Sequence, residues 1–196
     1  QGVLGLADKH NPDRLEAAVS GLHAQLGRLA ERGKLSSEQA AAAAEQIGIA
    51  NDLGELAPAG LVIEAIVELL PAKRELLSAL EDVVKPETIL ASNTSSLSID
   101  AMAAGLRVPG RVVGMHFFNP APVMRLVEVV HGELTDPAVV AAVHELAGSW
   151  GKIAVRVASS PGFIVNRVAR PFYGEAHRLV EEGAADPATI DAVMKQ

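Results

Sequence analysis

Two apolar runs near the middle of the chain each carry a residue that could hold or move a proton. In the segment GMHFFNPAPVMRLVEVV, residues 114–130, His116 lies near the end of the first run and Glu128 lies inside the second. A carboxylate within a strand of Leu and Val costs several kcal/mol if it is desolvated and unpaired. An imidazole beside a carboxylate that fixes its tautomer is the arrangement of a general base with its orienting partner.

The spacing of the two runs decides whether these side chains can meet. Parallel strands need a crossover of about a dozen residues or more, and the gap around residues 119–122 is shorter. We therefore expect an antiparallel hairpin, and a centre near Pro122 sets His116 opposite Glu128. Opposed Cβ atoms lie about 4.5–5.5 Å apart, which allows a hydrogen bond between the two side chains. A purely structural pair without catalysis is the alternative at this point.

Polar side chains also follow two other predicted strands. Glu68 and Lys73 come after the apolar run GLVIEAIV, and Ser95 lies in SNTSSLS, directly after the run TILAS. Open α/β sheets bind ligands at the carboxyl ends of their strands, so these residues are candidates for a binding site. The alternative for Glu68 and Lys73 is a solvated helix entrance. Glu64 lies within its run and is interpreted as a carboxylate that faces packing or a helix.

Asp8 and Asn166 are two further polar residues that could bind a ligand. Asp8 ends the run VLGLAD, where a dinucleotide-binding fold holds the adenosine ribose hydroxyls, although a helix-capping Asp is the alternative. No glycine-rich GxGxxG loop precedes it, so we expect the first strand and its phosphate-binding loop to lie before residue 1. Asn166 falls early in a predicted helix, where it could hold a substrate carbonyl or hydroxyl or simply be solvated.

Strand-like runs alternate with helical patterns along most of the chain, which predicts an α/β protein with a Rossmann-like, mainly parallel sheet that contains one antiparallel hairpin. The character changes at Ser159-Ser160-Pro161-Gly162, after which only helical patterns follow. We therefore predict a dinucleotide-binding domain over residues 1–158 and the start of an all-helical domain over residues 159–196. The predicted strands cover residues 3–8, 60–67, 88–92, 111–117, 125–130 and 152–158.

Composition narrows the class of protein. The chain has 196 residues, 49% of them hydrophobic, a net charge of −7 and no cysteine. The absence of a basic run argues against nucleic acid binding, and the absence of cysteine excludes disulfides and cysteine-ligated metals. Because no apolar stretch has the length of a membrane span and no signal peptide is visible, we expect a cytoplasmic protein that does not bind membranes. The sequence begins without Met and stops inside a helical pattern, so we expect it to be a piece of a longer chain.

Four segments together resemble one known family. VIEAIVE with Lys73, ASNTSSLSI, the segment of residues 114–130 and SPGFIVNRVARPFYGEAHRL resemble the L-3-hydroxyacyl-CoA dehydrogenases nearly end to end. In detail they are most similar to bacterial 3-hydroxybutyryl-CoA and phenylacetate-pathway members, which implies a place in β-oxidation or phenylacetate catabolism. The resemblance implies an NAD-binding Rossmann domain joined to a C-terminal helical domain that usually forms a homodimer. It also implies an acyl-CoA substrate and a reaction that needs no metal.

The resemblance also implies roles for individual residues. His116 is expected to be the catalytic base with Glu128 as its partner, Ser95 to bind the substrate oxygen, and Asn166 to assist there. The residues implied in ligand binding are Asp8 at the NAD ribose, Glu68, Lys73, Ser95 and Asn119 around the nicotinamide and pantetheine, and Arg28 and Arg32 as candidates for the CoA phosphates.

Two other functions fit parts of the same pattern. One is a Rossmann dehydrogenase that acts on free hydroxyacids, although such enzymes often use a lysine base where this chain has Asn166. The other is a non-catalytic Rossmann-like binding protein. The presence of His116, Glu128, Ser95 and Asn166 together argues against that second alternative, because a protein without catalytic activity does not need all four residues.

Overall fold

The computed structural model describes residues 4–6 and 12–195. The chain divides into two compact units, one of residues Gln1–Gly60 with Ser78–Thr88 and the other of residues Leu61–Leu77 with Ile89–Gln196. The strands predicted around His116 and Glu128, and the polar loops predicted near them, all belong to the second unit.

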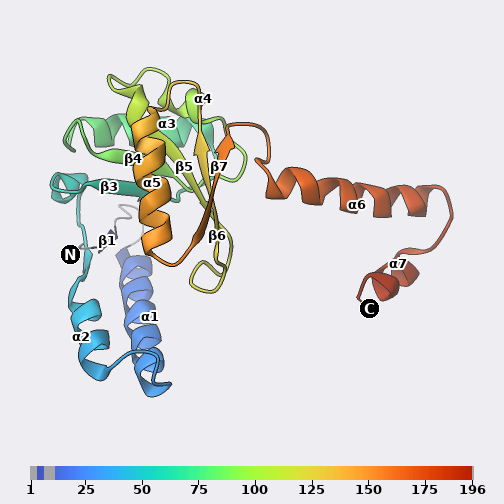
Figure 1. Ribbon diagram of the computed structural model, residues 1–196, viewed down its shortest axis with the longest axis horizontal. Coiled ribbons are helices and arrows are strands. Elements are labelled where there is room, and N and C mark those ends of the chain that lie inside the picture. Colours follow the sequence, from blue (N-terminus) through green and yellow to red (C-terminus); the bar gives the residue numbers. More distant parts are fainter. Residues whose placement is uncertain (1–3, 7–11, 196) are drawn as a thin grey trace. The chain divides into compact units, whose positions relative to one another are not determined.

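The first unit holds a small parallel sheet and two helices. Strand β1 (Leu4–Leu6) pairs in parallel with β2 (Ile47–Ile49), and α1 (Pro12–Glu31) contacts α2 (Ser37–Glu45) (Figure 1). Ser36 begins α2 because its hydroxyl accepts the Gln39 amide while the Gln39 side chain accepts the Ser36 amide, a reciprocal cap. The short 3-10 helix η1 (Leu53–Leu56) follows β2.

The second unit is built on a five-stranded sheet in the order β3-β4-β5-β6-β7. Every neighbouring pair is parallel except β5 and β6, which are antiparallel. The predicted mainly parallel sheet with one antiparallel hairpin is therefore confirmed. Its strands are β3 (Leu61–Glu64), β4 (Ile89–Ser92), β5 (Val112–Phe117), β6 (Leu126–His131) and β7 (Ile153–Ala158).

Helices connect these strands. They are α3 (Leu70–Glu81), α4 (Ile99–Ala103), the 3-10 turn η2 (Pro109–Arg111) and α5 (Pro137–Ser149). Asp136 caps α5 through the Ala138 amide, and Pro137 occupies the first helical position, where its missing N–H costs nothing.

The hydrophobic core lies where α5 covers one face of the sheet (Figure 1). Met115 and Val129 are buried against Val143 of this helix. Successive residues of a strand point to opposite faces. The alternation that sends Met115 and Val129 toward α5 therefore sends His116 and Glu128 to the other face.

Close packing on that other face requires a glycine beside His116. A Cβ atom at Gly114 would lie 2.8 Å from Cβ of Val130 on the opposed strand and 3.1 Å from Cδ1 of Ile99, the first residue of α4. Real Cβ atoms do not approach so closely, so any side chain here would displace β6 or α4.

The sequence pattern predicts one continuous strand over the run GLVIEAIV, whereas the structure forms a shorter strand there. Strand β3 ends at Glu64, and the chain turns away because the Glu64 carboxylate accepts the Ile66 amide at 3.1 Å. Glu64 is therefore the last residue of its strand and lies at the carboxyl edge of the sheet. Its carboxylate is buried and faces Lys73 of α3, so its interpretation as a packing-side or helix-facing carboxylate is confirmed.

Two helices follow the sheet, α6 (Val165–Glu181) and α7 (Pro187–Met194). Helix α6 leaves Val168, Phe172 and Tyr173 more than half exposed. Within the described part of the chain, no helix combines the length and apolar character needed to cross a membrane.

Candidate active site

His116 and Glu128 meet across the hairpin. They are directly opposed residues of β5 and β6, and His116 Nδ1 lies 2.7 Å from Glu128 Oε2. Both side chains are buried, Glu128 completely. The predicted antiparallel pairing and the predicted contact are thus confirmed, whereas the catalytic role of the pair stays a prediction.

The second oxygen of Glu128 binds the start of α6. Glu128 Oε1 accepts hydrogen bonds from the Ile164 amide at 2.9 Å and the Val165 amide at 3.0 Å. A helix N-terminus favours a negative charge, and these two N–H groups have no partner within the helix. With an imidazole on one oxygen and two amides on the other, the buried carboxylate is fully provided with donors, which offsets its desolvation.

The backbone before α6 makes this contact possible. Gly162 and Phe163 both have left-handed backbone torsions, with φ of 74° and 50°. That conformation is routine for glycine and uncommon for phenylalanine. The turn aims the following amides at Glu128 and also brings the buried Phe163 ring to the histidine.

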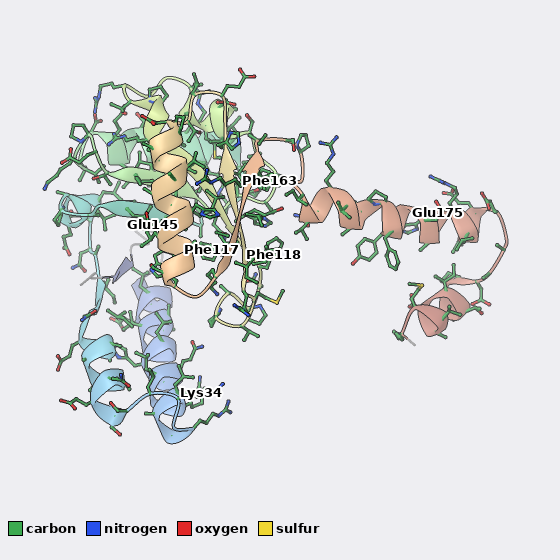
Figure 2. All side chains as sticks on the ribbon, in the orientation of Figure 1. Lys34, Phe117, Phe118, Glu145, Phe163 and Glu175 are labelled. Carbon is green, nitrogen blue, oxygen red and sulfur yellow. The ribbon has the colours of Figure 1, made fainter. Side chains whose placement is uncertain are left out.

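Aromatic rings flank the imidazole. The centroid of the His116 ring lies 4.5 Å from that of Phe118 and 5.7 Å from that of Phe163, and both phenylalanines are labelled in Figure 2. Because Nδ1 faces Glu128, Nε2 is the nitrogen that can exchange a proton with a substrate.

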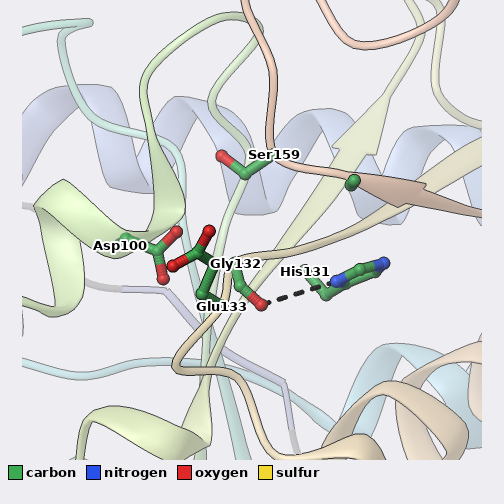
Figure 3. Close-up of a pocket in the computed structure, with 6 residues that line it drawn as sticks. Asp100, His131, Gly132, Glu133 and Ser159 are labelled. Atoms are coloured by element: carbon green, nitrogen blue, oxygen red, sulfur yellow. Dashed lines mark hydrogen bonds between the residues drawn. The ribbon is translucent and has the colours of Figure 1, made fainter.

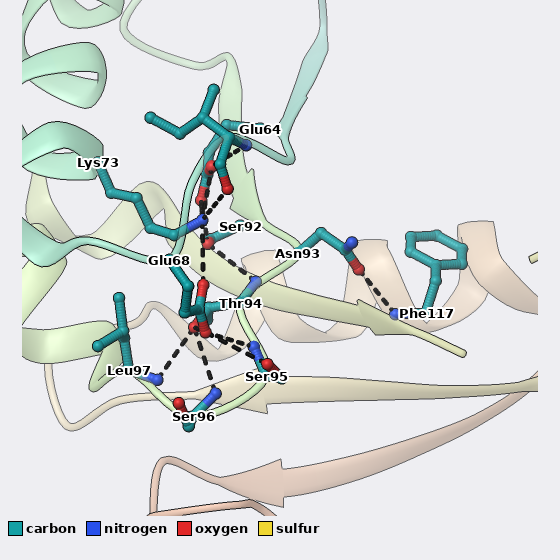
Figure 4. Close-up of polar contacts among 11 residues, drawn as sticks. Glu64, Glu68, Lys73, Ser92, Asn93, Thr94, Ser95, Ser96, Leu97 and Phe117 are labelled. Carbon is teal, nitrogen blue, oxygen red and sulfur yellow. Dashed lines mark hydrogen bonds and ion pairs between the residues drawn. The ribbon is translucent and has the colours of Figure 1, made fainter. Parts of the chain in front are cut away.

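A second polar cluster occupies the carboxyl ends of β3 and β4 (Figure 4). The ammonium of Lys73, with only 1% of the residue exposed, lies 2.9 Å from both carboxylate oxygens of Glu64 and 3.4 Å from Glu68 Oε2. Ser92 also donates its hydroxyl to Glu64 Oε1. Glu68 is the member that reaches the surface, with 37% of its side chain exposed.

Glu68 in turn holds the loop that follows β4. Its Oε1 accepts hydrogen bonds from the Thr94 hydroxyl at 2.6 Å, the Ser95 amide at 2.8 Å and the Ser95 hydroxyl at 3.3 Å. Partial burial by itself raises the pKa of Glu68, but the hydrogen bonds from Thr94 and Ser95, together with the charge of Lys73, outweigh that effect and hold the pKa below its ordinary value. Glu68 therefore favours the charged form that orients Ser95.

Asn93 ties this loop to the hairpin. Its side-chain oxygen accepts the Phe117 amide at 2.9 Å, and its own amide donates to the Glu64 carbonyl at 2.8 Å. The ends of β3, β4 and β5 are thereby joined next to His116, the residue before Phe117.

The remaining predicted site residues lie in different places. Asn166 is half-buried in the first turn of α6, next to the Val165 amide that Glu128 binds, and Asn119 is exposed in the loop between β5 and β6. Arg28 and Arg32 lie on and just after α1, in the first unit. Asp8 lies outside the described residues.

Two cavities occur elsewhere in the second unit. One, of about 220 Å³, is lined by Asp100, His131, Gly132, Glu133, Ala158 and Ser159 (Figure 3). The other, of about 510 Å³, is lined by Ser96, Pro161, Gly162, Arg167, Arg170 and Pro171. Neither cavity is lined by His116. The candidate site is therefore identified from the contacts among its side chains and not from a cavity. In the part of the chain that the structure describes, no group of three or more His, Asp or Glu side chains is placed to hold a metal ion.

Sequence reasoning missed Glu64 and Ser92 as members of the polar cluster. The one signal available was an acid followed nine residues later by a lysine, across an expected strand-to-helix turn. Ser92 gave no signal, because its partner lies on the neighbouring strand.

The hydrogen-bonding groups at this edge of the sheet fit a nicotinamide cofactor. The carboxyl ends of parallel strands in an open α/β sheet are where dinucleotides bind, and β3 and β4 are parallel neighbours there. Ser95 and Glu68 offer a hydroxyl and a carboxylate, which can pair with the carboxamide and hydroxyl groups of such a cofactor.

Known proteins are similar to this chain in sequence and fold. Residues 5–160 match the model of the 3-hydroxyacyl-CoA dehydrogenase NAD-binding domain, and residues 162–196 match that of the 3-hydroxyacyl-CoA dehydrogenase C-terminal domain. The 3-hydroxyadipyl-CoA dehydrogenase of Escherichia coli (strain K12) is 50% identical over 183 residues, which are 93% of this chain and 38% of that protein. The probable 3-hydroxybutyryl-CoA dehydrogenase of Bacillus subtilis (strain 168) is 46% identical over 185 residues, 94% of this chain and 64% of that protein.

A solved structure agrees with these matches. The crystal structure of 3-hydroxybutyryl-CoA dehydrogenase from Escherichia coli K12 superimposes with a TM-score of 0.90 at 49% identity, over 94% of this chain and 39% of that one. The chain thus spans less than two thirds of the length of each of these relatives. The match to the NAD-binding domain model, over residues 5–160, covers most of this chain. It shows that the chain belongs to the 3-hydroxyacyl-CoA dehydrogenase family.

Proposed function

We propose that the complete protein interconverts (3S)-3-hydroxyacyl-CoA and 3-oxoacyl-CoA with NAD as its cofactor. The observation that carries this proposal is the buried contact of 2.7 Å between His116 Nδ1 and Glu128 Oε2 in a chain of this family. A histidine with one nitrogen fixed by a carboxylate and the other available is suited to take a proton from an alcohol.

In the oxidation direction, His116 Nε2 takes the proton of the substrate 3-hydroxyl, and the imidazole becomes an imidazolium. Glu128 stabilises that charge through Nδ1 and holds the ring in one tautomer. The hydroxyl of Ser95 hydrogen-bonds to the substrate oxygen, and Asn166 assists at the same centre. As the carbonyl forms, the C3–H bond breaks and its hydride leaves the substrate for NAD⁺, which would supply the acceptor when bound. Phe118 and Phe163 contact the imidazole ring and limit its movement.

The substrate we propose is a short acyl-CoA thioester. The names of the relatives specify 3-hydroxybutyryl-CoA and 3-hydroxyadipyl-CoA, and others are alpha subunits of a fatty acid oxidation complex. We propose that the reaction belongs to β-oxidation or phenylacetate catabolism, as the resemblance in sequence implies. Glu68, Lys73, Ser95 and Asn119 are proposed to line the nicotinamide and pantetheine, with Arg28 and Arg32 as candidates for the CoA phosphates.

Assembly and location are part of the same proposal. We propose a cytoplasmic homodimer formed through the C-terminal helical domain, with the domain boundary near residue 159. What supports the dimer is the exposure of Val168, Phe172 and Tyr173 on α6, which further helices or a second copy would cover. Light scattering on the complete protein should give twice the mass of one chain; a monomer would contradict this part.

The activity is tested by comparing substrates. Formation of NADH should follow addition of (3S)-3-hydroxybutyryl-CoA or 3-hydroxyadipyl-CoA, and free 3-hydroxybutyrate should be a far weaker substrate. Equal or higher kcat/KM on the free acid would favour a hydroxyacid dehydrogenase of another kind. Absence of turnover with any of them, while NADH still binds, would favour a non-catalytic binding protein.

A further inference from the structure

We propose that Glu64 is a positioning residue for the dehydrogenase reaction, acting through Lys73 and Ser92 to fix the loop that carries Ser95. The inference rests on the proposed function, because it assigns Glu64 to the placement of a substrate-binding hydroxyl. Glu64 itself is 4% exposed and is enclosed by groups of the protein.

Two chains of contacts run from Glu64 to the loop. In the first, Lys73 lies between Glu64 and Glu68, and Glu68 accepts the amide and the hydroxyl of Ser95. In the second, Ser92 donates its hydroxyl to Glu64 and accepts the Thr94 amide at 3.2 Å. Both chains begin at one carboxylate and end on adjacent residues, Thr94 and Ser95 (Figure 4).

The chain of contacts that runs through Lys73 is stabilised by the pairing of opposite charges. A buried ammonium needs a compensating charge, and Glu64 supplies it with both oxygens at 2.9 Å. The more exposed Glu68 then remains free to hold Ser95 while it makes a longer contact of 3.4 Å with Lys73. Without Glu64, the same ammonium would draw Glu68 inward and away from the loop.

Substitution by glutamine conflicts with the donors around Glu64. Oε2 accepts both the Ile66 amide and the Lys73 ammonium, whereas Oε1 accepts Ser92 and Lys73. In either orientation, the glutamine NH₂ would face at least one donor, because an amide nitrogen cannot accept a hydrogen bond. Glu64→Gln therefore keeps the shape of the side chain but loses both its charge and part of its network.

The first readout needs no catalysis. Hydrogen exchange of the amides at residues 94–97 should become at least about tenfold faster in Glu64→Gln, while the hairpin amides at residues 114–116 and 128–130 keep their protection. The matched control is Glu75→Gln, an exposed acid on the same helix as Lys73. If loop and hairpin lose protection equally, Glu64 stabilises the domain as a whole and the proposal is wrong.

The second readout is kinetic. Misplacing Ser95 should lower kcat for (3S)-3-hydroxybutyryl-CoA by about 10- to 100-fold, while KM changes less than about threefold, because the residues proposed for the CoA phosphates, Arg28 and Arg32, are not part of this network. A rise in KM at unchanged kcat would overturn the proposal. Because the exchange experiment works without turnover, an inactive wild-type protein would refute the proposed function and leave the positioning of the loop still measurable.

A double-mutant cycle covers the case in which Glu64→Gln does not fold. Glu64→Gln/Lys73→Met removes both buried charges together, which is far less disruptive than leaving one of them unpaired. Compared with Lys73→Met alone, which leaves the buried Glu64 charge unpaired, the double variant should have an equal or higher kcat, since Glu64 acts chiefly through Lys73. A further loss of tenfold or more would contradict that route.

Discussion

His116 and Glu128 are directly opposed residues of one antiparallel hairpin, and the same carboxylate that lies 2.7 Å from the imidazole also binds the first amides of α6. One buried side chain thus joins the proposed base to the beginning of the helical segment. Any change at Glu128 should therefore affect both the histidine and the placement of Asn166 on α6.

Gly114 should tolerate no side chain. We expect Gly114→Ala to lower the free energy of unfolding by about 1–3 kcal/mol, because the added methyl group overlaps Val130 and Ile99. Gly148→Ala, in α5 with no atom within 4 Å of the added Cβ, is the control and should be neutral or slightly stabilising. Denaturant unfolding measures both, and equal stabilities of the two variants would contradict the packing described.

The lowered pKa of Glu68 predicts a dependence of stability on pH. Because the folded-state pKa lies below the unfolded-state value, the ionised carboxylate contributes stability above the unfolded pKa of about 4.3. That contribution is lost as the pH falls through the folded-state pKa. Thr94→Val removes one of the hydrogen bonds that lower the pKa. Part of its destabilisation should therefore be present at neutral pH and disappear in acid.

Thr94→Ser is the matched control for this effect, because it keeps the hydroxyl. Unfolding free energies measured from pH 7 down to about pH 3 should show parallel curves for Thr94→Ser and the wild type. The curve of Thr94→Val should converge toward them in acid. Curves that stay separated by a constant amount would mean that the Thr94 hydroxyl does not act through Glu68.

Asp8 is expected to hold the ribose hydroxyls of NAD and to repel a 2′-phosphate. Asp8→Ala should therefore weaken NADH binding and leave acyl-CoA binding nearly unchanged, as measured by separate titrations of the two ligands. Asp8→Asn tests the charge alone and should reduce the discrimination against NADPH. Higher kcat/KM with NADP than with NAD in the wild type would remove Asp8 from this role.

The hairpin and its central pair are predictable from the sequence because the reasons are local. The short gap excludes a parallel crossover, and the period of two places His116 opposite Glu128 once the turn is centred. The mainly parallel sheet follows in the same way from apolar runs that alternate with helices. Strand β2 was missed, because three residues, Ile47–Ile49, give too short a pattern.

Glu68, Lys73 and Ser95 were candidates from the sequence, but the parts of Glu64 and Ser92 in the polar cluster could not be predicted, because they depend on contacts between separate segments. The run around Glu64 reads as one strand, and it ends there only because the carboxylate turns to the Ile66 amide, Lys73 and a serine on the next strand. The contact of Glu128 with α6 likewise depends on a left-handed Phe163, a conformation that residue type does not predict. Such features become visible only when the fold brings the segments together.

The central claim is that His116 is the base and that Glu128 acts through it. The most direct test is kcat for (3S)-3-hydroxybutyryl-CoA oxidation in His116→Gln, Glu128→Gln and the double variant of the complete protein. General-base catalysis is worth about 10²–10⁴-fold, so each single variant should lose activity steeply. The double variant should lose scarcely more than His116→Gln, because residues that act as a unit are strongly non-additive. If Glu128→Gln keeps wild-type kcat, or if the two losses multiply, Glu128 does not act through His116 and the account is contradicted.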